Sequence, residues 1–246
     1  MTRVIKALFL TTFLSLISAV PVLAFSVAPT GPAMEIRMKT EYDGDVNRLK
    51  TSKETDKLVL VVGNPTDPAK TTLTYFEKDK NGMMQQVFSV EAVSGMNGIS
   101  TDKKEGDKKT PQGVYSFTSA FGMKENPGSI LSYRKVVDGD NFVDDGSSKY
   151  YNRLVNDREV ARDWNSAENL IRQAPHYNYA LVLNYNPDCI PGKGSAIFLH
   201  CPKSSNNTGT SGCISVPEDR AKELVTKVDQ NTKIIVVPEA KYLSEY

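Results

Sequence analysis

A histidine and a cysteine late in the chain have the residue types of a nucleophilic catalytic pair. His200 ends the apolar run 194–200, and Cys213 follows thirteen positions later, directly after Gly212. A thiolate is a strong nucleophile, and a histidine nearby can act as the general base that generates it. Backbone N–H groups at Gly212 and Cys213 are suited to stabilise the oxyanion that forms when a thiolate attacks a carbonyl. These residues predict covalent acyl chemistry, with Cys213 as nucleophile and His200 as base.

The helix predicted after Cys213 favours this chemistry. Ser215 and Glu218 have capping-box spacing, Pro217 falls in the first turn, and apolar residues recur at helical spacing, at Ala221, Leu224, Val225 and Val228. A helix that begins at Ser215 brings its unpaired N–H groups and the positive end of its dipole close to Cys213. We therefore expect the pKa of the Cys213 thiol to be lowered.

The remaining cysteines leave alternatives open. The chain has three cysteines, Cys189, Cys201 and Cys213, and an odd number in an exported protein leaves at least one thiol unpaired. Cys201 follows His200, so in an extended strand it points to the opposite face. A Cys189–Cys201 disulfide is one alternative, and a purely structural Cys213 is another. A zinc site built from these cysteines and His200 is a third, although it lacks the close C-x-x-C spacing of structural zinc sites.

Short strands separated by turns make up most of the chain around this pair. We expect strands over 57–65, 110–122, 179–186, 194–200 and 232–239, and a hairpin over 71–95 that turns at Asn81-Gly82. Helices are predicted over 164–174, with Ser166 as N-cap, and over 215–229. The pattern indicates a mainly β (α+β) fold: one β-sandwich-like domain over 55–240 with a few packed helices. Residues 25–54 show no sustained period and are predicted to form an N-terminal arm.

The first 24 residues have the layout of a secretory signal peptide. Arg3 and Lys6 precede the apolar run 7–22, and a small-x-small site precedes Phe25. The run is short for a membrane span, which takes roughly 20 residues. We expect cleavage, export to the periplasm or cell envelope, and no stable membrane insertion afterwards. Loss of the two basic residues takes the net charge from +1 to −1, and a near-neutral chain without a basic run argues against nucleic-acid binding.

The sequence around the pair resembles the L,D-transpeptidase catalytic domain, the YkuD/ErfK family. His200 is followed by the Thr-x-Gly-Cys pattern at 210–213, and the segments 106–122, 144–155, 164–171, 181–186 and 192–200 look like successive blocks of that family. The resemblance covers roughly residues 55–238. It implies a mainly β domain in the cell envelope, a cysteine acyl-enzyme, and no metal or organic cofactor.

The resemblance also implies roles for individual residues. Cys213 matches the nucleophile, His200 the base, and Gly212 with its neighbours Ser211 and Cys213 the backbone around the oxyanion. The residues implied to line the substrate cleft are Asp144, Ser147, Tyr151, Asn152 and Thr210. The usual family pattern has a second histidine where Ser211 stands, and Arg or Asn where Ser215 stands.

The function implied is attack on the third residue of a peptidoglycan tetrapeptide stem, with release of D-alanine. If an amine then accepts the acyl group, the product is a cross-link between stem peptides. If water accepts it, the protein is an L,D-carboxypeptidase, or a hydrolase of peptidoglycan or of protein–peptidoglycan linkages. A non-catalytic wall-binding module is the alternative of a different class.

Overall fold

The computed structural model describes residues 46–204 and 207–246. The predicted signal peptide (1–24) and residues 25–45 of the predicted arm lie outside the described residues. Within the described residues, no helix is long and apolar enough to span a bilayer.

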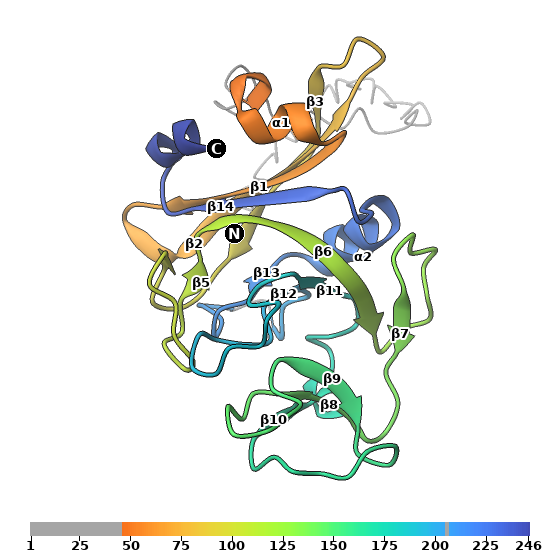
Figure 1. The fold of residues 1–246 in the computed structure, drawn as a ribbon. Helices are drawn as coiled ribbons and strands as arrows, with labels where there is room; N and C mark the ends of the chain where they lie inside the picture. The colour runs from red at the N-terminus through yellow and green to blue at the C-terminus, as the bar shows by residue number, and fades with distance from the viewer. Residues whose placement is uncertain (1–45, 205–206) are drawn as a thin grey trace, which may run out of the picture. The chain divides into compact units, whose positions relative to one another are not determined.

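Most of the regular structure in these residues is β-strand (Figure 1). The longer strands are β1 (Lys57–Asn64), β2 (Asp67–Lys78), β3 (Met84–Val93), β6 (Gly113–Gly122) and β14 (Lys233–Val237). The shorter strands are β4 (Ile99–Ser100), β5 (Thr110–Pro111), β7 (Tyr133–Lys135), β8 (Asp140–Val143), β9 (Arg153–Asn156), β10 (Ala167–Asn169), β11 (Ala180–Leu183), β12 (Phe198–His200) and β13 (Ile214–Ser215). The helices are α1 (Lys50–Glu54) and α2 (Glu218–Lys227), with 3-10 helices η1 (Val46–Arg48), η2 (Leu170–Gln173) and η3 (Ala240–Glu245). The predicted mainly β class is confirmed.

The described strands form one large sheet and two small ones. The large sheet has nine strands in the order β11-β12-β13-β3-β2-β1-β14-β6-β7. Because β6 pairs with β14 and also with β11, the order of strands closes on itself. Strands β10, β8 and β9 form a separate sheet, which Figure 1 shows at the end of the molecule away from α1. The two-stranded sheet joins β4 to β5.

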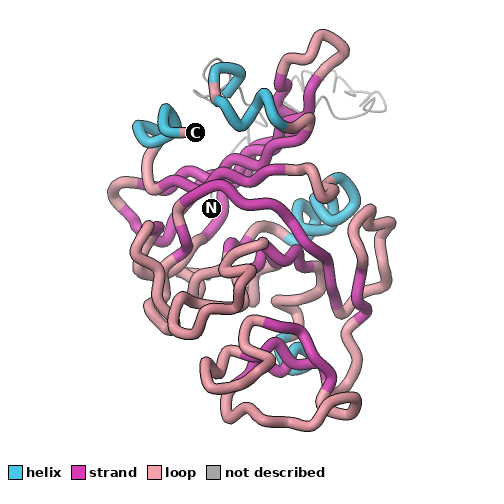
Figure 2. Tube along the Cα trace, viewed as in Figure 1, coloured by secondary structure: helices cyan, strands magenta, loops and turns pink. Residues whose placement is uncertain are grey.

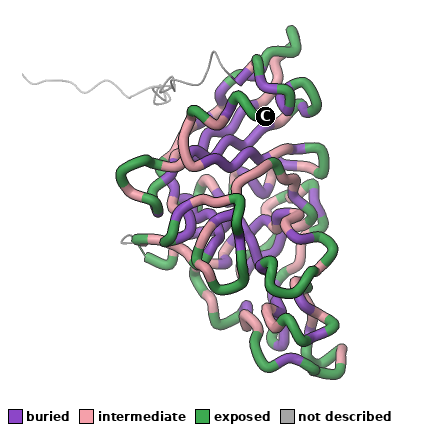
Figure 3. Tube along the Cα trace, turned by 60° about the vertical axis from the view of Figure 1, so that its left-hand side comes forward, coloured by how far each residue is buried: buried purple, intermediate pink, exposed green. Residues whose placement is uncertain are grey.

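Three apolar clusters hold these layers together, and Figure 3 shows the buried residues concentrated along the strands. The largest cluster lies against one face of the main sheet and includes Leu199, Ile214 and the buried side of α2. The second packs the N-terminal helical segment and η3 onto β1, with Val46 and Leu58 as members. In the third, Phe142 of the three-stranded sheet meets Phe198 of β12 edge to face, with ring centroids 4.8 Å apart. This third cluster contains Cys213.

Each predicted strand is present at least in part, with 194–200 forming a strand only over Phe198–His200, whereas the predicted helices differ. The hairpin of β2 and β3 turns between Asp79 and Met83, with Gly82 at φ +75°. The segment 164–174 forms β10 and the single turn η2 instead of a longer helix, because residues 167–169 pair with β8. Figure 2 shows how little of the chain is helical.

The predicted capping box does not form. Ser215 lies in β13, where it pairs with His200 on one side and with Val93 on the other, so α2 begins only at Glu218. The predicted arm over 25–54 also differs at its end, since residues 46–54 form η1 and α1 and bury Val46 and Leu49 against β1. Local patterns cannot reveal either outcome, because both depend on strands that are distant in the sequence.

Candidate active site

His200 of β12 and Cys213, which directly precedes the neighbouring parallel strand β13, lie on the same face of the sheet. Leu199 pairs with Ile214 and His200 with Ser215, and Leu199 and Ile214 both point into the largest cluster. Since side chains alternate along a strand, Cys213 and His200 point to the opposite face. The Phe198 N–H donates a hydrogen bond to Cys213 Sγ at 3.3 Å, which places the sulfur beside the residue two positions before His200.

The Cys213 thiol is buried and protonated in this arrangement. Its side chain donates a hydrogen bond to the Ala196 carbonyl oxygen at 3.2 Å. Burial raises the pKa of the Cys213 thiol, the negative charge of Glu168 raises it further, and the positive charge of Lys103 acts in the opposite direction. The expected lowering of the pKa is therefore wrong. The dipole of α2 cannot supply it, because that helix begins at Glu218, beyond β13.

His200 has the protonation state that a general base requires. Its Nδ1 lies 2.6 Å from the Cys201 carbonyl oxygen. A carbonyl can only accept, so Nδ1 carries the proton and Nε2 keeps its lone pair. Burial lowers the pKa of His200 to about 4, so the imidazole is neutral at neutral pH. The ring packs edge to face on Tyr177, with centroids 5.3 Å apart.

Cys201 lies on the opposite face from His200, as the sequence predicted. It belongs to the largest cluster, its thiol donates to the Tyr179 carbonyl oxygen at 3.5 Å, and burial raises its pKa to about 12. All three cysteines are free. The described residues contain no group of three or more His, Cys, Asp or Glu side chains that could hold a metal ion.

The turn before Cys213 is fixed by its own hydrogen bonds. The Gly212 N–H donates to Thr210 Oγ1 at 3.1 Å, and the Thr210 hydroxyl donates to the Cys213 carbonyl oxygen at 2.7 Å. Gly212 has φ +141°, and a Cβ there would lie 2.8 Å from the Lys109 carbonyl oxygen. Ser211 is exposed in this turn. Of the two predicted oxyanion amides, the Gly212 N–H is thus already bonded, whereas the Cys213 N–H makes no hydrogen bond within the described part of the chain.

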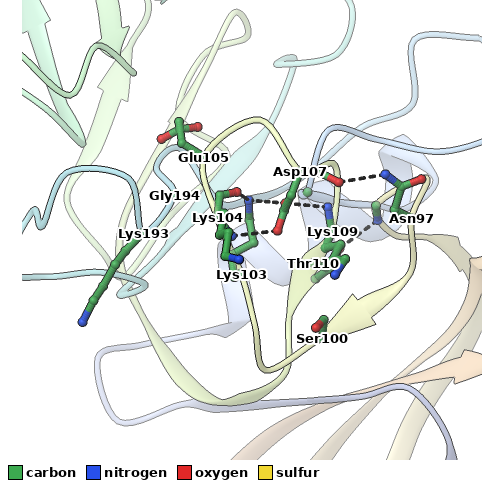
Figure 4. Close-up of polar contacts among 12 residues, drawn as sticks. Asn97, Ser100, Lys103, Lys104, Glu105, Asp107, Lys109, Thr110, Lys193 and Gly194 are labelled. Carbon is green, nitrogen blue, oxygen red and sulfur yellow. Dashed lines mark hydrogen bonds and ion pairs between the residues drawn. The ribbon is translucent and has the colours of Figure 1, made fainter.

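A charged loop that contains Lys103 and Asp107 (Figure 4) approaches Gly212. The Lys103 side chain is 3% exposed, and its ammonium donates to Asp107 Oδ1 at 2.7 Å and to the Lys104 carbonyl oxygen at 2.6 Å. Asp107 also accepts from the backbone N–H groups of Lys104 and Lys109. A Cβ on Gly212 would lie 3.6 Å from Lys103 Cε. This places a buried cation against the backbone of the candidate nucleophile.

The resemblance implied that Tyr151 and Asn152 line the substrate cleft. In the structure, both side chains instead hold the backbone segment of Ala196, whose carbonyl oxygen accepts the hydrogen bond from the Cys213 thiol. The Tyr151 hydroxyl donates to Glu105 Oε2 at 2.5 Å and accepts from the Gly194 N–H at 3.1 Å. Asn152 Oδ1 accepts from the Ala196 N–H at 3.1 Å. Tyr151 is only 2% exposed. Both side chains therefore bond to backbone next to Cys213 rather than to open solvent.

The two other implied cleft residues lie in one loop but have different surroundings. Asp144 Oδ1 is buried and has no hydrogen-bond partner among the described residues, and its charge contributes to raising the pKa of Glu168. Ser147 is exposed, and its hydroxyl donates to Asp145 Oδ1 at 2.6 Å. Asp144 is thus brought to the polar surroundings of Cys213, whereas Ser147 serves the turn of its own loop.

Sequence reasoning missed Glu168 and Tyr177. The Tyr177 hydroxyl donates to Glu168 Oε2 at 2.5 Å, and its ring packs on Phe198 and His200. Burial raises the pKa of Glu168, although the Tyr177 hydrogen bond partly offsets this. Glu168 lies in the segment predicted as a helix, so no pattern indicated that β10 would bring it to Cys213.

Comparison with known protein families gives a match over most of the chain. The model of the YkuD family, described as the L,D-transpeptidase catalytic domain, matches residues 60–236. Comparison with curated proteins gives no match.

Similar solved structures include the helical cell shape determining protein Pgp2 from Campylobacter jejuni, 16% identical, with a TM-score of 0.40 over 80% of this chain and 54% of that one. An L,D-transpeptidase (Yku) from Stackebrandtia nassauensis is 13% identical, with a TM-score of 0.37 over 76% of this chain and 57% of that one. L,D-transpeptidase 1 of Mycobacterium tuberculosis is 16% identical, with a TM-score of 0.35 over 74% and 62%. This chain spans less than two thirds of each of these structures. By its family match, the chain belongs to the YkuD family of L,D-transpeptidase catalytic domains.

Proposed function

We propose that this protein is an exported peptidoglycan L,D-transpeptidase in which Cys213 is the nucleophile and His200 the base. The observation that carries the proposal is their common face, at the end of β12 and directly before β13, with the His200 tautomer fixed by Cys201 so that Nε2 is free to accept a proton. Membership of the YkuD family supports the reaction class. The substrate, a peptidoglycan stem peptide, follows from that class.

The first half-reaction forms a thioester. His200 Nε2 takes the proton of the Cys213 thiol as the sulfur attacks the carbonyl of the third stem residue. The Cys213 N–H stabilises the oxyanion. When the tetrahedral intermediate collapses, the bond to D-alanine breaks, and its amine leaves with the proton that His200 returns.

The second half-reaction releases the acyl group to an acceptor. An amine from a neighbouring stem attacks the thioester, the C–S bond breaks, and an amide forms. His200 takes the surplus proton from the amine and returns it to the Cys213 sulfur. Water in place of the amine yields a tripeptide and makes the same machinery a carboxypeptidase.

Substrate binding must precede deprotonation of Cys213. Burial raises the pKa of the thiol and lowers that of His200, so an ion pair of thiolate and imidazolium is unfavourable without substrate. The thiol must also leave the Ala196 carbonyl oxygen. We infer that the proton moves as the sulfur attacks, and that the resting thiol is protected from oxidation.

The test is mass spectrometry of a disaccharide-tetrapeptide incubated with residues 25–246. Loss of D-alanine with dimer formation is the expected result, and a covalent adduct should appear on Cys213. The variant Cys213→Ala should show neither, whereas Cys189→Ala should behave as wild type because that half-buried thiol lies in a separate turn. Full turnover by Cys213→Ala contradicts the proposal. Tripeptide monomers alone identify water as the acceptor.

A further inference from the structure

Ala196, whose carbonyl oxygen accepts the hydrogen bond of the Cys213 thiol, has a backbone conformation that alanine rarely adopts. Its φ is +55°, in the left-handed region that a Cβ disfavours. The residue is buried, and no backbone N–H group of the described residues donates to its carbonyl oxygen. A buried carbonyl normally has a partner, and here the partner is the thiol, at 3.2 Å. The left-handed conformation thus aims this carbonyl at the sulfur.

Asn152 holds Ala196 in that conformation. Its Oδ1 accepts a hydrogen bond from the Ala196 N–H at 3.1 Å, and its Nδ2 donates to the carbonyl oxygens of Tyr185 and Asn186 at 3.0 and 2.9 Å. The Asn152 backbone is also left-handed, with φ +58°, and its N–H donates to the Val143 carbonyl oxygen at 2.8 Å. Unfavourable backbone conformations persist where the surroundings fix them, and these four hydrogen bonds do so here.

Two backbone groups contact the Cys213 sulfur, and they favour different protonation states. The Ala196 carbonyl can only accept, so it binds the thiol and repels a thiolate. The Phe198 N–H, 3.3 Å from the sulfur, donates and favours the thiolate. Between them, the Ile197 carbonyl oxygen accepts from the Leu183 N–H at 3.1 Å, which fixes the intervening backbone. When the proton leaves, the sulfur must therefore turn away from a carbonyl that is held in place.

We propose that Asn152 is a positioning residue for the nucleophile: it holds the Ala196 carbonyl against the Cys213 thiol, and this contact keeps the proton on the sulfur until a substrate displaces it. We call this chain of hydrogen bonds the thiol latch. The inference rests on the proposed function, because it requires Cys213 to be the nucleophile. Asn152 acts through Ala196 and does not itself contact the sulfur.

The test first removes the Asn152 amide and then removes the reason that Ala196 needs it. Asn152→Gly keeps a left-handed backbone at 152 without strain and deletes the acceptor of the Ala196 N–H. Ala196 should then relax to a conformation that suits alanine and carry its carbonyl away from the sulfur. In the double variant Asn152→Gly/Ala196→Gly, the left-handed conformation at 196 carries no steric cost, so the carbonyl should return towards the thiol.

Asn186→Gly is the matched control. Asn186 is also left-handed, with φ +48°, and its amide also bonds to backbone, at Ile190 and Gly194. Its substitution removes the same kind of side chain from the neighbouring turn but leaves the Ala196 N–H bonded to Asn152. A merely structural effect of losing an amide should therefore appear in both variants alike.

The readout is the S–H stretching band of Cys213 in the infrared spectrum of the exported protein. The band is isolated in a Cys189→Ala background as the difference from Cys213→Ala. A hydrogen bond weakens the S–H bond, so we expect the band to move to higher frequency in Asn152→Gly, to return towards its wild-type position in the double variant, and to stay in place in Asn186→Gly. Alkylation of Cys213 by iodoacetamide should be about two- to tenfold faster in Asn152→Gly, as suits the loss of one hydrogen bond to the neutral thiol.

These measurements need no substrate, so the latch and the proposed function can fail separately. An S–H band that stays in place in Asn152→Gly, or that moves equally in Asn186→Gly, would overturn the latch alone. A band that does not return in the double variant would overturn the role of the left-handed conformation in it. A wild type that releases no D-alanine from a tetrapeptide would overturn the proposed function, and with it the positioning role of Asn152, even with the band shifted.

Discussion

The Cys213 thiol donates its hydrogen bond to the carbonyl oxygen of Ala196, at 3.2 Å, while the His200 ring on the same face is held by the Cys201 carbonyl. The proposed nucleophile and the proposed base are therefore each bonded to backbone when no substrate is bound. This arrangement keeps both groups neutral, because burial opposes charge on either one. The reactivity of Cys213 then depends on how a bound substrate changes these hydrogen bonds, and on the fixed charges around the Cys213 sulfur.

The charges of Glu168 and Lys103 act in opposite directions on the Cys213 thiol, so variants at these two positions should have opposite effects on its pKa. Glu168 raises the pKa of the Cys213 thiol, so Glu168→Gln should lower that pKa and speed alkylation of Cys213 by iodoacetamide. Lys103 lowers the pKa, so Lys103→Met should raise it and slow alkylation. The alkylation rate at pH 8 should change about tenfold for each unit by which the pKa moves, and the change should be larger for Glu168→Gln than for Lys103→Met, because Glu168 has the larger effect on the pKa.

The alkylation rates should be measured by intact mass in a Cys189→Ala background, so that the half-buried thiol does not contribute. Lys104→Met is the matched control for Lys103→Met, because the Lys104 side chain is 69% exposed and its ammonium pairs with Asp102. Equal alkylation rates in all variants would show that neither charge acts on the sulfur.

His200 should make the protein less stable in mild acid. Its pKa is about 4 in the folded protein and about 6.5 in an unfolded chain, so between these values only the unfolded state binds the proton. The contribution of His200 to the stability of the fold is therefore complete above pH 6.5 and is lost as the pH drops towards 4. We expect a loss of about 2 kcal/mol between pH 7.5 and pH 5 by urea unfolding. His200→Gln should remove this part of the pH dependence, and an unaltered dependence would refute the assignment.

Gly212→Ala should destabilise the protein more than Gly82→Ala. Both glycines have positive φ, at +141° and +75°, so both substitutions introduce backbone strain. Only at Gly212 does the new Cβ meet backbone, the Lys109 carbonyl oxygen at 2.8 Å, whereas the space at Gly82 is open. We expect Gly212→Ala to cost about 1–3 kcal/mol more in unfolding free energy. Equal losses for the two variants would argue against close contact between this turn and the Lys103 loop.

Tyr151→Phe should lower both stability and turnover. It removes the hydroxyl that joins Glu105 to the Gly194 N–H, and it leaves the buried Gly194 N–H without this partner at a cost of about 1–3 kcal/mol. The segment that carries Ala196 then loses one of its supports. Tyr150→Phe is the matched control, because the Tyr150 ring packs on Trp164 and its hydroxyl has no hydrogen bond among the described residues. Thermal unfolding and D-alanine release test the two effects separately.

From the amino-acid sequence alone we could predict most of the strands and name candidates for the catalytic residues. Cys213, His200 and Gly212 were identifiable from residue type and spacing, and the family match covers the segments that resemble L,D-transpeptidases. The hairpin of β2 and β3 and the strands β1, β6 and β14 follow from local apolar patterns and turn residues. These strands and this turn depend on residues that are close together in the chain, so a local sequence pattern predicts them.

The protonation states of Cys213 and His200, the helix boundaries and the residues that support the site became known only from the three-dimensional fold. Pairing with Val93 and His200 made Ser215 a strand residue and moved the start of α2 away from Cys213, which removed the expected lowering of the thiol pKa. Pairing with β8 converted a predicted helix into β10 and brought Glu168 close enough for its charge to raise the pKa of the Cys213 thiol. Burial and contacts between distant strands set these outcomes, and both arise only when the sheets have assembled.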